Sequence, residues 1–128
     1  GANRSLPVSW SAAPAAKAYA IVLEDPDAPG AAPFVHWLVW NIPANVTRLA
    51  EGAPPPASAM QGSNGTGAAG YHGPHPPSGT HHYHLEVFAL DRPLGLAAGA
   101  NRDALAAALR GHVIAAGETI GLYSAPAH

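Results

Sequence analysis

The hydrophobic residues of the chain fall into short runs separated by stretches rich in glycine and proline. In Leu6–Trp10 every second residue is large and apolar, which predicts a short strand. Tyr19–Glu24, Phe34–Ile42 and His81–Leu90 contain β-branched and aromatic residues, and each is followed within three residues by a proline, which ends a strand. Glu118–Tyr123 predicts a terminal strand. The pattern is therefore mainly β.

One segment near the end of the chain has the features of a helix. Asn101 is a suitable N-cap, and Leu105 and Leu109 are spaced i, i+4 on one face. Gly111 suits the residue that follows the C-cap. The sequence therefore predicts one short C-terminal helix over Asn101–Gly111.

Residues 51–80 form a long stretch of Gly, Pro, Ser and Asn without apolar periodicity. An irregular segment of this length in a compact domain is usually functional or disordered. The chain has no internal repeat and no boundary in composition, and a length of 128 residues suits one domain. We therefore expect a single domain over residues 1–128.

Composition and charge exclude several classes of function. With six Lys and Arg, a net charge of −2 and no basic cluster, the chain is not expected to bind nucleic acid. No apolar run reaches the roughly 18 residues of a membrane span. The absence of cysteine excludes disulfides, thiolate chemistry and Cys-based zinc sites. The expected location is the cytoplasm, with the periplasm or secretion after signal removal as the alternative.

The alternation of side chains along a strand divides the histidines of His81–Leu90 between its two faces. His81 and Tyr83 share a face with apolar residues further along the strand, so we expect both to point inward. His82 and His84 lie on the other face with Glu86, near water. A His-x-His metal site on this face is an alternative, but histidines on the outer face of a strand are more often simply exposed to solvent. We therefore expect no metal and no cofactor.

Two other segments carry groups that suit an anion pocket. Asp25 and Asp27 follow a strand closely and can orient a neighbouring imidazole, whereas His36, which shares parity with Leu38 and Trp40, is expected to be half-buried and to need a partner. In Gly70–Gly79, glycines and prolines fix a loop whose backbone N–H groups can form an anion-binding nest. Together these groups suit a phosphate-like ligand.

Three motifs in order resemble the phosphatidylethanolamine-binding protein (PEBP) family, and most closely its bacterial Raf-kinase-inhibitor-like branch. They are Asp25-Pro26-Asp27-Ala28-Pro29, His36-Trp37-Leu38-Val39-Trp40-Asn41-Ile42-Pro43 and Gly70-Tyr71-His72-Gly73-Pro74-His75-Pro76-Pro77-Ser78-Gly79-Thr80-His81-His82-Tyr83. Each motif alone is modest, but their order and spacing are specific. The resemblance covers nearly the whole chain, apart from the family's usual N-terminal opening segment of about two dozen residues, which this sequence lacks.

The resemblance implies an antiparallel, Greek-key β-sandwich with a small helical element and an anion pocket. It also implies a homodimer, and it makes Ala28–Pro29 a candidate cis peptide bond. His75 stands where bacterial relatives often have cysteine, and His82 stands where many members have arginine. Carried over position by position, the ligand-binding residues are Asp25, Asp27, His36, Gly73, His75, Pro76, His81 and Tyr83.

Three functions are compatible with this site. We favour a binding protein for a phosphorylated or otherwise anionic small molecule, acting as a carrier, sensor or regulator. An enzyme that uses the pocket His, Asp and Tyr residues for acid–base isomerisation or cyclisation is the first alternative. The sequence offers neither a cysteine nor a Gly-x-Ser-x-Gly motif as an activated nucleophile, so no catalytic residue is assigned. A protease or kinase inhibitor is the second alternative.

Overall fold

The structure of the chain is a computed structural model, and it describes residues 8–25, 34–49, 55–71 and 80–124. Within these ranges the backbone alone is described for Asp25, Phe34, 80–83 and 118–124. The expected Ala28–Pro29 cis bond lies outside the described residues. None of the helices in the described ranges is long and apolar enough to cross a membrane.

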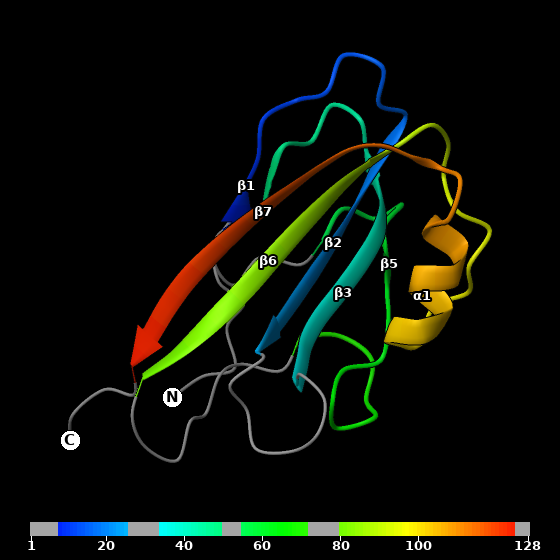
Figure 1. The fold of residues 1–128 in the computed structure, drawn as a ribbon. Coiled ribbons are helices and arrows are strands. Elements are labelled where there is room, and N and C mark those ends of the chain that lie inside the picture. The colour runs from blue at the N-terminus through cyan, green and yellow to red at the C-terminus, as the bar shows by residue number, and fades with distance from the viewer. Residues whose placement is uncertain (1–7, 26–33, 50–54, 72–79, 125–128) are drawn as a thin grey trace.

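Two antiparallel sheets and one helix make up the described fold (Figure 1). The larger sheet has the strand order β5-β3-β2-β6-β7. Its strands are β2 (Ala18–Asp25), β3 (Phe34–Pro43), β5 (Met60–Gln61), β6 (Thr80–Leu90) and β7 (Val113–Ser124). The smaller sheet pairs β1 (Val8–Ser9) with β4 (Arg48–Leu49). The expected antiparallel β architecture is therefore confirmed.

Both faces of the larger sheet are buried at its centre, which explains why β2 and β3 read as continuous hydrophobic runs rather than alternating ones. One face packs against residues of the smaller sheet, with Tyr19, Trp37 and Val39 in the same cluster as Val8 and Leu49. The opposite face packs under the helix, in a cluster that contains Val22, Leu38, Trp40, Leu90, Leu105 and Leu109. Trp37 and Trp40 therefore pack on opposite faces of the sheet.

The predicted helix is confirmed as α1 (Arg102–Leu109). The Asn101 side chain accepts a hydrogen bond from the Ala104 N–H at 2.9 Å, as an N-cap does. Leu105 and Leu109 are buried against the sheet. Gly111 has a φ of 80°, a left-handed conformation that favours glycine after a C-cap.

Replacing Asn101 with alanine is expected to lower the free energy of unfolding by about 1 kcal/mol, because the Ala104 N–H loses its acceptor. Chemical denaturation followed by circular dichroism measures this change. Asn101→Ser retains an acceptor at the N-cap and is expected to unfold close to the wild-type midpoint. Equal midpoints for the two variants would contradict the capping role.

Three differences from the sequence-based expectations concern β7, β5 and β6. The terminal strand is longer than Glu118–Tyr123, because β7 pairs with β6 from Val113 onward. The stretch 51–80 is not wholly irregular, because it contains the two-residue strand β5. The face of β6 that carries His84 was expected to lie near water, but His84 is only partly exposed and the same face continues under α1 at Leu90.

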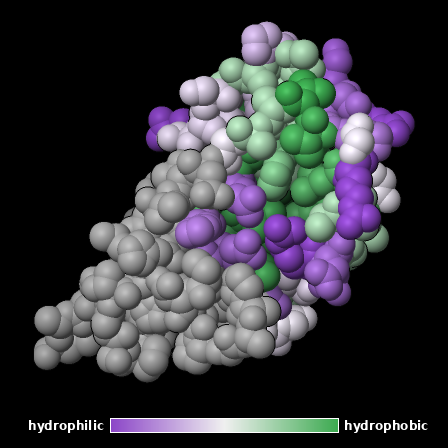
Figure 2. Space-filling model, viewed as in Figure 1, coloured by the Kyte–Doolittle hydropathy of each residue, from purple (hydrophilic) through white to green (hydrophobic). Residues whose placement is uncertain are grey.

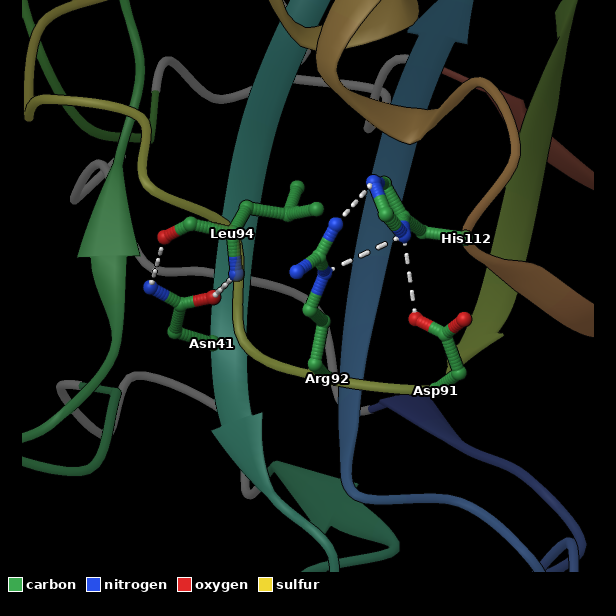
Figure 3. Close-up of polar contacts among 5 residues, drawn as sticks. All are labelled: Asn41, Asp91, Arg92, Leu94 and His112. Atoms are coloured by element: carbon green, nitrogen blue, oxygen red, sulfur yellow. Dashed lines mark hydrogen bonds and ion pairs between the residues drawn. The ribbon is translucent and has the colours of Figure 1, made fainter.

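Two polar clusters hold the loop between β6 and α1 (Figure 3). Asn41, with a φ of 59°, donates to the Leu94 carbonyl at 2.9 Å and accepts from the Leu94 N–H at 2.6 Å. Beside it, His112 Nδ1 lies 3.1 Å from Asp91 Oδ1, and the Arg92 guanidinium lies against the same imidazole. These contacts anchor the end of the sheet opposite to the predicted pocket.

Candidate functional site

The end of β2 and the start of β3 bring the first two motifs together. In the antiparallel pairing of these strands, Asp25 lies opposite Phe34, two positions before His36. The backbone of Asp25 and the side chain of His36 are therefore placed at the same end of the sheet. Asp27 lies outside the described residues.

His36 occupies a β-bulge in β3. Leu23 pairs with Trp37 and Glu24 pairs with Val35, so His36 is an extra residue on β3 without its own partner position on β2. Bulges re-aim a side chain and are frequent next to functional sites. The imidazole was expected to be half-buried, but the residue is 5% exposed and thus buried more deeply.

The start of β6 lies at the same end of the sheet. Glu24 pairs with His84, so the backbone of residues 81–83 extends beyond the paired part of β2, at the end of the sheet where β2 ends (Figure 1). β6 pairs with β7 without a register shift from Thr80 to Ala89, and position 81 faces Tyr123. Positions 81 and 83 therefore keep the same parity as the buried Leu85.

The third motif begins beside β3. Trp37 donates from Nε1 to Gln61 Oε1 at 2.7 Å and makes an edge-to-face contact with Tyr71, with ring centroids 5.4 Å apart. Gly70 and Tyr71, the first two residues of the motif, are thereby held near Trp37. Gly73, His75 and Pro76 lie outside the described residues. The structure thus places His36 and the backbone of Asp25, His81 and Tyr83 at the same end of the larger sheet, and their role in binding a ligand stays a prediction.

An ion-pair cluster near this end was not predicted. Arg102, in the first turn of α1, places Nε 3.7 Å from Glu24 Oε2 and Nη2 3.8 Å from Glu86 Oε1. These residues come from three elements, so no local sequence signal connects them. The guanidinium partly neutralises the two carboxylates, one of which belongs to the residue before Asp25. Figure 2 shows hydrophilic side chains bordering a hydrophobic area of the described surface in this view.

Two cavities formed by described residues lie away from the predicted pocket. One of about 600 Å³ is lined by Trp10, Tyr19, Val87, Ala89, Ala115 and Gly117, among others. Another of about 290 Å³ lies beside Arg92 and His112. No predicted site residue lines either cavity. Among the side chains that the structure describes, no group of three His, Asp or Glu residues is arranged to hold a metal ion.

Comparison with known proteins gives the family. The model of the phosphatidylethanolamine-binding protein family matches residues 1–124. The chain belongs to the PEBP family. The resemblance seen in the three sequence motifs is therefore confirmed.

Sequence relatives of this PEBP chain include archaeal UPF0098 proteins. The protein of Methanothermobacter thermautotrophicus is 42% identical over 128 residues, which cover 96% of this chain and 84% of the relative. UPF0098 protein PH1269 of Pyrococcus horikoshii is 48% identical over 115 residues, which cover 84% of this chain and 57% of the relative.

Solved structures agree with this assignment. CT736 of Chlamydia trachomatis, described as a PEBP homologue, is 37% identical with a TM-score of 0.89, covering 96% of this chain and 82% of that one. YbcL of Escherichia coli, described as a new member of the mammalian PEBP family, is 34% identical with a TM-score of 0.85. That match covers 97% of this chain and 82% of YbcL. The fold described above is therefore a PEBP fold.

Proposed function

We propose that this PEBP-family chain is a small-molecule-binding protein whose pocket takes phosphate or a phosphorylated headgroup-like ligand. It would act as a carrier, sensor or regulator. The observation that supports this most directly is the meeting of three strands at one end of the larger sheet. There β2 ends at Asp25, the bulge of β3 holds His36, and β6 begins at Thr80.

The proposed ligand-binding residues supply complementary chemistry for an anion. Imidazolium and hydroxyl groups donate charge-assisted hydrogen bonds to phosphate oxygens, and a carboxylate orients the imidazoles. Backbone N–H groups of the Gly-Pro loop add a nest. Burial of His36 strengthens any such bond, because the local dielectric is low. The proposed set is Asp25, Asp27, His36, Gly73, His75, Pro76, His81 and Tyr83.

The proposal predicts that anion affinity increases as the pH falls. A histidine of ordinary pKa, about 6.5, gains its positive charge below that value, and the charged form binds an anion more tightly. Isothermal titration with phosphate, sulfate and phosphoethanolamine at about pH 6 and about pH 8 brackets this pKa. Sulfate keeps its charge over this range, so its affinity change reports the protein's titration alone.

Three outcomes are informative. Tighter sulfate and phosphate binding at the lower pH supports the proposal. Equal affinity at both pH values, or no binding of any of the three anions, contradicts it. Conversion of phosphoethanolamine during the titration, detected by phosphorus NMR, would instead favour an acid–base enzyme.

A further inference from the structure

A short loop with a dense hydrogen-bond network runs from the end of β5 into the start of the third motif. We call residues 62–71 the Asn64 loop. Its start is tied to β3 and to the residue before the N-cap of α1, because the Gly62 N–H donates to the Leu38 carbonyl and the Ser63 N–H donates to the Ala100 carbonyl. Its two ends are joined by the bond from the Gly70 N–H to the Gly62 carbonyl at 3.0 Å. The loop is therefore an ordered unit fixed to the larger sheet.

Asn64 lies at the centre of this unit and is 8% exposed. Its Nδ2 donates to the Gly70 carbonyl at 2.9 Å, while its Oδ1 accepts from the N–H and the hydroxyl of Thr66. A buried amide whose nitrogen and oxygen are both hydrogen-bonded favours one geometry, because a rearrangement would leave a polar group unpaired. The side chain thus fixes the position of Gly70 relative to residues 64–66.

The same unit is bonded to the strand that carries the buried histidine. The Gly65 N–H, next in sequence to Asn64, donates to the Val35 carbonyl at 2.8 Å. Val35 directly precedes the bulge residue His36. Asn64 and Gly65 together therefore connect Val35 of β3, the neighbour of His36, with Gly70, the first residue of the third motif.

We propose that Asn64 is a positioning residue for the anion pocket, holding Gly70 in a fixed place relative to His36. This inference rests on the proposed function. It assigns Asn64 no contact with the ligand. Its effect on binding passes through Gly70 and Val35, as outer-shell partners act through the ligands of a metal site.

Three neutral variants test the inference, so that no added charge confuses the anion affinity. Asn64→Ala removes the bond to Gly70, whereas Thr66→Ala removes one bond to Asn64 and leaves the tie to Gly70 in place. Asn41→Gly removes two side-chain hydrogen bonds to the Leu94 backbone at the other end of the sheet. Glycine adopts the φ of this position freely. This variant is the control for general loss of stability.

We expect Asn64→Ala to weaken phosphate binding about tenfold, as loss of an outer-shell partner does elsewhere. Thr66→Ala and Asn41→Gly should retain the wild-type Kd. Isothermal titration gives the Kd values, and NMR of the ligand-free protein gives the His36 imidazole resonances, which only Asn64→Ala should shift. If Asn64→Ala does not fold, Asn64→Ser, whose hydroxyl is too short for Gly70, makes the same comparison.

The outcomes separate this inference from the proposed function. If the wild-type chain binds phosphate and Asn64→Ala binds it equally well, Asn64 is not a positioning residue. If the wild-type chain binds no phosphate, the proposed function fails, and the His36 resonances decide the inference alone. Unchanged resonances in Asn64→Ala would overturn it, and so would equal shifts in Asn41→Gly.

Discussion

Replacing Gly62 with alanine is expected to destabilise the folded chain by about 3 kcal/mol, as overpacking in a tight core does. A Cβ at this position would lie 2.5 Å from the Ala100 carbonyl oxygen, 2.8 Å from Trp40 Cζ3 and 3.0 Å from Leu38 Cδ1. The nearest of these atoms is backbone, so it cannot rotate away. The Gly62 backbone cannot withdraw either, because its N–H and C=O are both hydrogen-bonded within the sheet and the Asn64 loop.

Gly117→Ala is the matched control for Gly62→Ala. Apart from its two chain neighbours, no atom of the described residues lies within 4 Å of a Cβ built on Gly117, and its φ is not left-handed. Alanine in place of a strand glycine should stabilise the chain by up to about 1 kcal/mol. Urea denaturation of both variants measures the difference, and similar midpoints would show that the close approach at Gly62 is relieved at little cost.

Replacing His36 with phenylalanine is expected to weaken phosphate binding roughly 10- to 150-fold. This range corresponds to the loss of one hydrogen bond to a charged group, about 1.5–3 kcal/mol. Phenylalanine preserves an aromatic ring of similar size in the buried position but can neither donate a proton nor carry charge. Isothermal titration of phosphate into the wild-type chain and the variant gives the two Kd values that are compared.

His112→Phe serves as the control for His36→Phe. His112 lies in the cluster with Asp91 and Arg92, at the far end of β6 from position 81. Its replacement removes a partly exposed histidine without touching the proposed pocket. An equal loss of affinity in both variants would indicate general damage, and unchanged affinity in His36→Phe would remove His36 from the pocket.

The strands that could be predicted from the sequence include those that are apolar on both faces, whichever strands they pair with. Tyr19–Glu24 and Phe34–Ile42 lie within β2 and β3 because residues buried on both faces must be apolar regardless of register. The helix was recognisable from its cap and leucine spacing. β4 and β5 were missed, because a two-residue strand is defined by its pairing and has no periodicity of its own.

The candidate site could be predicted only in part, for a related reason. The motifs identify which residues to consider, but a bulge arises from the register between two strands, which alternation along one strand does not contain. Simple alternation groups His36 with Leu38 and Trp40, and the bulge at His36 interrupts that alternation. The contacts of Arg102 with Glu24 and Glu86 likewise depend on how α1 lies over the sheet.

The Asn64 loop has a consequence for the chemical ageing of the protein. Asn64 precedes a glycine, and in unfolded chains this neighbour lets the next backbone nitrogen attack the side-chain amide most readily, which makes such asparagines labile. In the folded chain the Asn64 side-chain amide is hydrogen-bonded to Gly70 and Thr66, and the Gly65 N–H donates to the Val35 carbonyl. Deamidation should therefore be slow while the loop stays closed. The rate at which stored protein acquires an acidic form in isoelectric focusing would then measure how often this loop opens.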